Sequence, residues 1–356
     1  PPQFNTMKFL SGGSEATEAS MKMARQYHRQ TGHANKYKII SRYWSYHGGT
    51  MGALAASGGA SRKQFFEPYA TGYVHVPPPF CYRCPYGLER PSCGIACATA
   101  VEEFVKGEGP DTVAAIIAEP VIVSGDGFVV PPDEYFPILR DICDRHGILL
   151  ILDEIITGFG RLGKMWGAEV VGAWPDILAA GKGMSAGYYP LSVVLLTDTI
   201  TEAFWGDEDE DVQFHAGHTY GGNPVAGAAG LAAVQQIVEN DMPKRVSHLG
   251  EYLMGELELL KKKHPVVGQI TGKGLLIGIE YVQDRETHEP FPTDLAFAKK
   301  VDLACRKRGL VTRPSTNVQV LAPPFIITKE QLNTLVAILD EAIADATLEF
   351  APELSN

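Results

Sequence analysis

The sequence lacks several features that mark whole classes of proteins. None of its apolar runs is long enough to span a lipid bilayer, and no secretory signal stands at its start. Basic residues are outnumbered, with 31 Lys and Arg against 42 Asp and Glu, and the resulting net charge of -11 disfavours a nucleic-acid partner. Internal repeats and low-complexity linkers are also missing. We therefore expect neither a membrane span nor nucleic-acid binding.

The chain also lacks an initiator methionine. It begins Pro1-Pro2 and reaches a functional-looking loop almost at once, so we expect that the natural N-terminus is missing. Its 356 residues, 45% hydrophobic and 21% charged, suffice for a large core and two domains. An acidic chain with scattered thiols, of which Cys143 and Cys305 fall in helix-like stretches, indicates a cytoplasmic protein with reduced cysteines.

Short apolar runs alternate with amphipathic stretches in the first part of the chain. Residues 114–119, 148–153 and 191–196 are predicted strands, and residues 135–145 form a predicted helix between the first two. This order predicts an α/β fold with a mostly parallel central sheet and helices on both faces.

The later part of the chain predicts a second, smaller α+β domain. We place the boundary between residues 243 and 244, so that a large domain covers 1–243 and a C-terminal domain covers 244–356. The predicted strands of the smaller domain are 274–280 and 318–321, and its predicted helices are 297–308 and 329–346.

Lys182 has the most distinctive surroundings of any residue in the chain. Glycines flank it, and small apolar neighbours of this kind lower the pKa of a lysine and favour a free amine, which forms a Schiff base with an aldehyde. Asp153 lies 29 residues upstream at the end of a predicted strand, where it could pair with a basic ring nitrogen. Together they suggest a site for pyridoxal phosphate, although a structural lysine in a glycine-rich loop is the alternative.

Asp153 is followed by a second acid, Glu154. Adjacent side chains on a strand point to opposite sides, so the two cannot both face one ligand. One of them can be functional while the other makes a structural ion pair.

Three further segments each have two interpretations. The turn SGGS at residues 11–14 opens a predicted helix and suits a phosphate, but Ser14 could instead be a simple N-cap. Tyr46, beside His47 and two glycines, could stack on a planar ligand or pack on the core. Thr219 precedes a predicted helix and could reach a phosphate or belong to a capping turn.

These segments match one family in order along almost the whole chain. The matching motifs are SGGSEA, SYHGG, AEPV, LDEIITGFGRLG, AAGKG, HTYGGNP, KGLLIGIE, RGLVTRP and LAPPF. Each motif is weak alone, but the combination is specific. The chain resembles the class III aminotransferases, which are pyridoxal-phosphate enzymes of fold type I.

The resemblance implies a role for each candidate residue. Lys182 would bind pyridoxal 5'-phosphate as a Schiff base and then shuttle a proton, while Asp153 would keep the pyridine nitrogen protonated. Ile155 would press on one ring face and Tyr46 would stack on the other. The remaining cofactor contacts would come from Gly13, Ser14, His47, Glu119 and the partner subunit's Thr219.

The resemblance also implies a substrate site and an assembly. Arg313 matches an arginine that binds a substrate carboxylate and can swing aside, although a surface arginine after a strand is the alternative. Ile156 stands where amino-acid-specific members often carry glutamine, which favours amines and ω-amino acids. Gly12 replaces a common serine, and we expect phosphate binding to survive because backbone N–H groups do much of that work. The active unit would be a homodimer or a dimer of dimers with shared sites.

We therefore expect an ω-type transaminase that passes nitrogen from an amine or amino-acid donor to a keto acid such as pyruvate or 2-oxoglutarate by a ping-pong mechanism. Decarboxylating transamination or amino-group migration on the same scaffold is an alternative, which evolution of carbon dioxide or turnover without an acceptor would favour. Family members usually carry roughly a hundred further residues before the SGGSEA loop. A truncated, cofactor-binding but inactive subunit is therefore a third hypothesis.

Four of the six cysteines crowd into one segment. Cys81, Cys84, Cys93 and Cys97 have the spacing C-x2-C-x8-C-x3-C, and four thiolates could close a tetrahedral zinc site. The middle spacing is shorter than in common zinc ribbons, and the resembled family needs no metal. We therefore expect no metal, with the zinc site kept as the alternative to a loop of reduced thiols near the active-site mouth.

Overall fold

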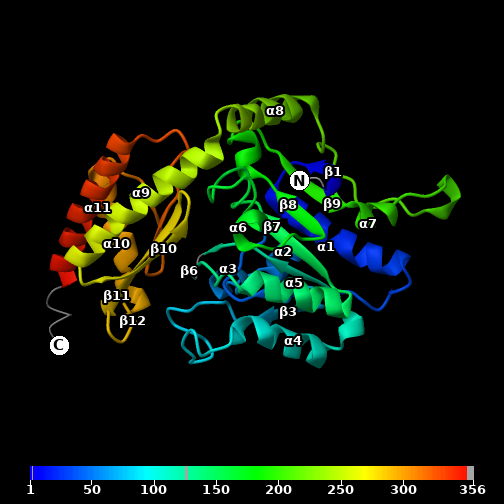
Figure 1. The fold of residues 1–356 in the computed structure, drawn as a ribbon, viewed down its shortest axis with the longest axis horizontal. Helices are drawn as coiled ribbons and strands as arrows, with labels where there is room; N and C mark the ends of the chain where they lie inside the picture. The colour runs from blue at the N-terminus through cyan, green and yellow to red at the C-terminus, as the bar shows by residue number, and fades with distance from the viewer. Residues whose placement is uncertain (2, 125–126, 351–356) are drawn as a thin grey trace.

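The computed structural model describes residues 1, 3–124 and 127–350 of the chain. Figure 1 shows a larger body built around a twisted sheet and a smaller C-terminal body beside it. Residues 351–356 of the expected C-terminal domain lie outside the described residues. Within the described part of the chain, every helix is too short or too polar to cross a lipid bilayer.

The larger body holds a seven-stranded sheet in the order β1-β9-β8-β7-β4-β2-β3. β9 is antiparallel to both its neighbours, and the other four pairs are parallel, so the prediction of a mostly parallel sheet is confirmed. The link from β8 to β9 is too short for a parallel crossover, which explains the reversal of β9. The strands are β1 (Phe4–Leu10), β2 (Lys38–Arg42), β3 (Tyr73–Val76), β4 (Val113–Ala118), β7 (Leu149–Glu154), β8 (Ile177–Ala180) and β9 (Ser192–Thr197).

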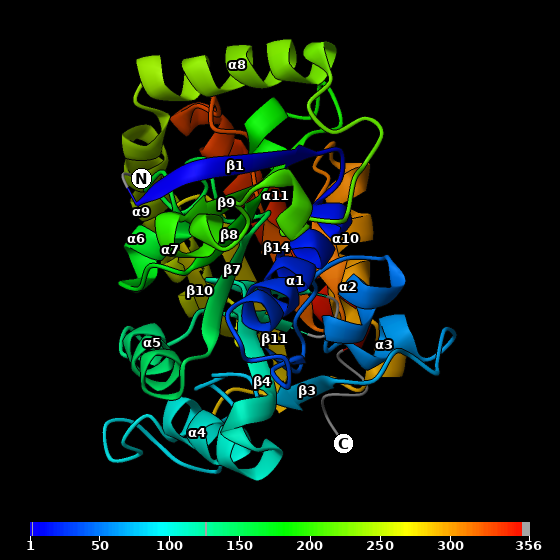
Figure 2. The same ribbon diagram turned by 90° about the vertical axis from the view of Figure 1, so that its right-hand side faces the viewer.

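Helices cover both faces of this sheet because its central strands are apolar on both sides. In β4, Ile116 packs in one core with α4 (Ala96–Glu108) and α5 (Tyr135–His146), whereas Ile117 packs in another with α1 (Gly13–Gln30). Figure 2 shows α5 and α1 on opposite sides of β7. The other helices of this body are α2 (Met51–Ala56), α3 (Ala60–Lys63), α6 (Gly167–Val171), α7 (Asp198–Glu202) and the 3-10 turns η1 (Pro110–Thr112), η2 (Lys182–Ser185) and η3 (Glu208–Glu210).

The smaller body has its own antiparallel sheet and its own core, drawn from residues between Val246 and Phe350. The long helix α8 (Pro224–Glu239) leads into it along the upper edge of the molecule (Figure 1). Our division between residues 243 and 244 falls in the first turn of α9 and stays a proposal. The elements are α9 (Met242–Lys263), β10 (Val267–Lys273), β11 (Leu276–Asp284), β12 (Glu289–Pro290), η4 (Thr293–Leu295), α10 (Phe297–Lys307), β13 (Arg313–Ser315), β14 (Val318–Leu321) and α11 (Lys329–Phe350).

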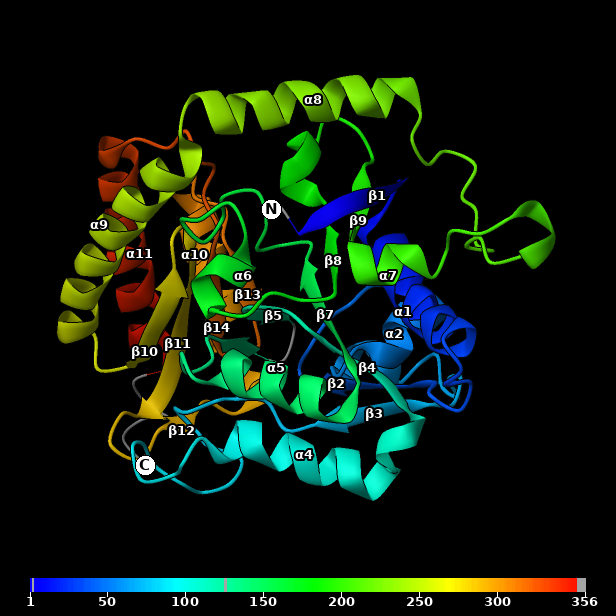
Figure 3. The same cartoon turned by 45° about the vertical axis from the view of Figure 1, so that its right-hand side comes forward.

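A small hairpin joins the two bodies. It consists of β5 (Ile122–Ser124) and β6 (Gly127–Val129), and Figure 3 shows it next to β13 and β14. Phe128 of the hairpin packs where a side chain at Gly278 of β11 would stand, since a Cβ there would lie 2.5 Å from the Phe128 ring. The two bodies therefore meet through an apolar contact beside the strand ends of the large sheet.

Candidate active site

Four neighbouring strands of the large sheet end with chemically active residues at one edge. Arg42 ends β2, Glu119 follows β4, Asp153 lies near the end of β7, and Lys182 follows β8 after one glycine. Ala118 pairs with Leu152 in the sheet, so the next residues, Glu119 and Asp153, lie beside each other at the ends of neighbouring strands. The structure thus brings Glu119 and Asp153, the two acids that end predicted strands, to the same edge of the sheet as Lys182.

A chain of buried polar groups connects these residues. Nδ1 of His47 lies 2.9 Å from Oδ2 of Asp153, and its Nε2 lies 3.9 Å from Oε2 of Glu119. Arg42 donates from Nη2 to Oε2 of Glu119 at 3.1 Å. Their side chains are at most 8% exposed, so water does little to weaken the interactions between their charges. His47 therefore fixes the position of the Asp153 carboxylate, and Glu119 and Arg42 in turn fix His47.

The SGGS turn and the SYHGG loop form one cup. Ser14 lies inside the first turn of α1 and its Oγ accepts a hydrogen bond from the Gly49 N–H at 2.9 Å. The interpretation of Ser14 as the N-cap is wrong, since Gly12 is the N-cap and Oε2 of Glu15 accepts its N–H. The free first-turn N–H groups of α1 and the Ser14 hydroxyl suit an anion such as phosphate.

Two residues border the space where a flat ring would fit. A Cβ at Gly13 would lie 3.0 Å from Cγ2 of Ile155, so the glycine leaves room for the isoleucine side chain. Oδ1 of Asp153 accepts from the Ile155 N–H at 3.1 Å, which fixes the aspartate beside that side chain. Tyr46 is half-buried; its N–H donates to Glu119 at 2.9 Å, and Arg62 lies 4.5 Å from its ring centre.

Lys182 begins the 3-10 turn η2 with a left-handed backbone, at φ 43. Its side chain reaches an open pocket, yet the surrounding protein lowers its pKa by desolvation. Asp153 opposes this effect, and Arg313 adds to the lowering. The uncharged amine of Lys182 is therefore more favoured in the folded protein than it is for a lysine in water.

Glu154 points away from the site, as strand alternation requires. Among the residues that the structure describes, Glu154 is held by two backbone N–H groups and the Thr157 hydroxyl, and not by the ion pair that the sequence allowed. Oε2 and Oε1 of Glu154 accept the N–H groups of Gly167 and Ala168 at 2.6 and 2.8 Å, and burial raises its pKa to about 7. Glu154 thus fixes the start of α6, and Asp153 is the acid of this pair that faces the site.

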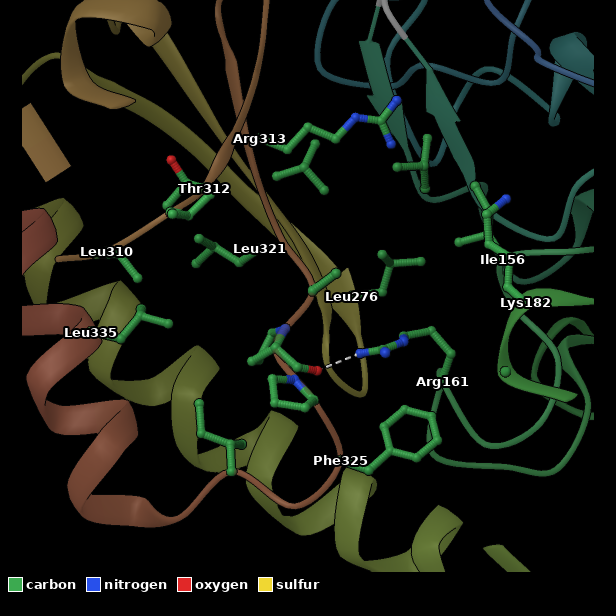
Figure 4. Close-up of a pocket in the computed structure, with 18 of the residues that line it drawn as sticks. Ile156, Arg161, Lys182, Leu276, Leu310, Thr312, Arg313, Leu321, Phe325 and Leu335 are labelled. Atoms are coloured by element: carbon green, nitrogen blue, oxygen red, sulfur yellow. Dashed lines mark hydrogen bonds between the residues drawn. The ribbon is translucent and has the colours of Figure 1, made fainter. Parts of the chain in front are cut away.

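Lys182 and Arg313 line the same cavity between the two bodies, with a volume of about 550 Å³ (Figure 4). Its walls are mostly apolar and include Leu276 and Leu321 from the smaller body. Arg161 also lines it and donates to the carbonyl of Pro323 at 2.7 Å. The cavity therefore combines an amine and two guanidinium groups with apolar surface, which suits a small molecule bearing a carboxylate.

Thr219 is the site candidate that stands apart from the others. Its side chain is exposed, while the neighbouring His218 lies 3.7 Å from Glu15 in the first turn of α1. Its expected role in a partner's site stays a prediction. The four clustered cysteines are also separate, since they line a second cavity of about 420 Å³.

Sequence reasoning missed Arg42 and gave no role to Arg161. Arg42 ends the short apolar strand KIISR and is 1% exposed, so the available signal was a basic residue at the end of a buried run. Arg161 stood within a matched motif. Desolvation lowers the pKa of Arg161 to about 10, which only its tertiary surroundings reveal.

The residues present fit pyridoxal phosphate. A depressed-pKa lysine suits its aldehyde, a buried carboxylate suits its ring nitrogen, and the Ser14 cup suits its phosphate. The fold and the site thus define an enzyme of the pyridoxal-phosphate class with fold type I.

Comparison with known proteins identifies the family. The profile described as "Aminotransferase class-III" matches residues 2–343, and the chain belongs to this family. It is 42% identical to aminotransferase YhxA of Bacillus subtilis, over 94% of this chain and 74% of that one. It is 36% identical to the adenosylmethionine-8-amino-7-oxononanoate aminotransferase of Geobacter sulfurreducens, over 98% of this chain and 76% of that one.

Two further comparisons bear on the cofactor and the acceptor. A PLP-bound amine transaminase from an uncultivated Pseudomonas species superimposes with a TM-score of 0.92 at 35% identity, covering 97% of this chain and 78% of that one. The taurine–pyruvate aminotransferase of Bilophila wadsworthia is 34% identical over 98% of this chain and 77% of that one. Pyridoxal 5'-phosphate is the cofactor of this chain, and its class of reaction is transamination.

Proposed function

We propose that this protein transfers the amino group of an amine or ω-amino acid to a keto acid such as pyruvate or 2-oxoglutarate. The observation that carries the proposal is the cavity that Lys182 and Arg313 share, because it offers an amine and a carboxylate-binding cation within apolar walls. An amine transaminase and a taurine–pyruvate aminotransferase are among the similar proteins, which supports the choice of donor and acceptor.

Bound pyridoxal phosphate supplies an electron-withdrawing ring and an aldehyde carbon at which amino groups are exchanged. Lys182, with its lowered pKa, can take up a proton at Nζ and return it. Asp153, fixed by His47, can stabilise a proton on a ring nitrogen beside it. Arg313 can bind the keto-acid carboxylate with two parallel hydrogen bonds.

The apolar walls of the cavity favour amino donors whose substituents are uncharged. Leu310 and Leu321 line it with Ile156, and none of these can pair with a second carboxylate or an ammonium group. An uncharged substituent therefore binds there by burial of apolar surface. This composition supports an amine or ω-amino acid as the donor.

We also propose that the active unit is a homodimer or a dimer of dimers in which the partner subunit's Thr219 reaches the phosphate. The exposure of the Thr219 side chain supports this arrangement.

The substitution Lys182→Ala tests the chemistry. Transamination of a panel of amines with pyruvate should fall by on the order of 10²–10⁴-fold from lost proton transfer alone. Lys262→Ala, at the exposed end of α9, should keep wild-type rates. Wild-type rates in Lys182→Ala would refute the assignment. A wild-type protein that retains cofactor but turns over no amine would instead support an inactive subunit.

A further inference from the structure

The segment that leads into Arg313 has no regular secondary structure of its own. Helix α10 ends at Lys307 and β13 begins at Arg313, and residues 308–312 between them form neither helix nor strand. Leu310 and Thr312 of this segment line the same cavity as Arg313 (Figure 4). The contacts that hold this segment therefore decide where the side chain of Arg313 starts.

A buried carboxylate holds this segment against α10. Asp302 of that helix is 4% exposed, and its Oδ1 accepts both the N–H of Thr312 at 3.2 Å and the Thr312 hydroxyl at 2.7 Å. Its Oδ2 accepts from Nε of Arg306 at 2.6 Å. Burial alone would raise the pKa of Asp302, but the hydrogen bonds from Arg306 and Thr312 more than offset this effect, so the pKa lies below its ordinary value. Asp302 is therefore ionised at neutral pH and binds Thr312 through charge-assisted hydrogen bonds.

A second contact holds Thr312 from the sheet of the smaller body. Gln319 of β14 is fully buried, and its Nε2 donates to the Thr312 hydroxyl. The next residue of that strand, Val320, pairs with Arg313 in the sheet. The Thr312 hydroxyl thus donates to Asp302 and accepts from Gln319, so one side chain connects α10 to β14 directly before Arg313.

Arg313 and the residue before it differ in their surroundings. Thr312 is 9% exposed and makes three hydrogen bonds to buried side chains, whereas the side chain of Arg313 is exposed. A long arginine side chain can change its direction while its own backbone stays in place. The structure therefore combines a fixed backbone with a guanidinium that has room to move.

We propose that Asp302 and Thr312 are positioning residues for the recognition of the acceptor's carboxylate. They fix the backbone from which Arg313 projects, so that its guanidinium meets a carboxylate at one place in the cavity. An irregular segment without these hydrogen bonds would lose conformational freedom on binding, and this loss would weaken the complex. The inference rests on the proposed binding of the keto-acid carboxylate by Arg313.

The substitution Thr312→Val in the holoenzyme tests the proposal, because it removes the hydroxyl and keeps the size of the side chain. In a ping-pong reaction, kcat/KM for each substrate reports its own half-reaction. We expect kcat/KM for pyruvate to fall by roughly 3–10-fold, the range of one lost hydrogen bond. An amine donor and an aldehyde acceptor that both lack a carboxylate should keep wild-type values. Thr312→Ser restores the hydroxyl and should restore pyruvate, and Thr334→Val, an exposed change on α11, is the matched control.

A second variant, Asp302→Asn, keeps the shape of the carboxylate but weakens its hydrogen bonds, and should show the same selective fall for pyruvate. Cofactor absorbance at the Lys182 site reports whether each variant folds. An equal fall of kcat/KM for pyruvate, amine and aldehyde would overturn the proposal, since it would indicate a structural role alone. If Arg313→Gln loses pyruvate selectively while Thr312→Val keeps wild-type kinetics, the positioning role alone fails. If Arg313→Gln has no selective effect, the proposed carboxylate site fails and the positioning role with it.

Discussion

Burial decides, residue by residue, which ionisable groups of this protein can carry charge. Lys182 loses part of its preference for the charged form because protein replaces water around it. His28 of α1 is 2% exposed, and its Nε2 lies 2.9 Å from the Ala114 carbonyl. We expect the first effect to matter for the proposed chemistry of Lys182 and the second to matter for the stability of the fold.

His28 should make the protein less stable in acid. Burial lowers its pKa to about 4; the Ala114 carbonyl opposes the shift, and Lys36 and His33 add to it. As the pH falls below about 6.5, the usual pKa of histidine, His28 becomes protonated in the unfolded state but stays neutral in the folded state. The free energy of unfolding should therefore fall by about 3 kcal/mol between pH 6.5 and pH 4. Melting temperatures of wild type and His28→Gln over this range should converge as the pH falls. A gap that stays constant would contradict the assignment.

Arg313 should affect one half-reaction more than the other. Arg313→Gln removes a charge-assisted pair with the keto-acid carboxylate, so the KM for pyruvate should rise by roughly 10–100-fold. The KM for an uncharged amine donor should change little. Steady-state kinetics with each substrate varied in turn measure both values, and Arg29→Gln, an exposed change on α1, is the control. An equal rise for both substrates would argue against carboxylate binding by Arg313.

At the scale of elements, strand register brings the site together. Sequence patterns predicted β4, β7, β9, α5 and α8, and in the smaller body β11, β14, α10 and α11, because these are long or strongly apolar. They left β1, β2, β3, β8, β10, β12 and β13 unassigned, because most of these strands are short or carry polar residues that hide their periodicity. Arg42 was missed with β2, although it completes the polar chain to Asp153.

The contact between α1 and the SYHGG loop gives a prediction at this scale. Gly48 has φ +141, and a Cβ there would lie 2.7 Å from the Ser14 Cα, so Gly48→Ala must move the backbone of the cup. An overpacking cost of about 1–3 kcal/mol in the bound state corresponds to roughly 5–150-fold weaker binding of pyridoxal phosphate, measured by titration of the apoenzyme. Gly12→Ala should bind normally, because its Cβ would meet nothing within 4 Å. Equal affinities for the two variants would exclude this packing effect.

At the scale of the whole molecule, the two bodies enclose the cavity that we propose for the substrate, and a second chain is expected to complete the cofactor site. Arg161 of the large body donates to the carbonyls of Leu275 and Pro323 in the smaller body. These hydrogen bonds connect the two bodies at the wall of the cavity. Arg313 lies on the far side of that boundary from Lys182. Movement between the bodies would therefore change the distance between the two groups.

Mixed dimers test the sharing of sites. Lys182→Ala and Thr219→Ala homodimers should each be impaired at limiting cofactor. If Thr219 serves the partner's site, a heterodimer of the two variants has one fully wild-type site, and an equal mixture should recover about a quarter of the wild-type sites. Activity after refolding together, compared with mixing of intact homodimers, measures this recovery. No recovery would place Thr219 in its own subunit's site or outside any site.

The sequence by itself determined the residue types of the site, because each follows a strand or opens a helix and so carries a local pattern. Glu119 and Asp153 end predicted strands, and Lys182 was found by the glycines that flank it. Only the tertiary structure decided which of them touch. The pairing of His47 with Asp153 spans 106 residues, and that of Arg42 with Glu119 spans 77, so both depend on sheet register. The position of four cysteines around one cavity has the same origin, because their spacing only places them in one segment, and the fold of that segment decides that all four line the same space.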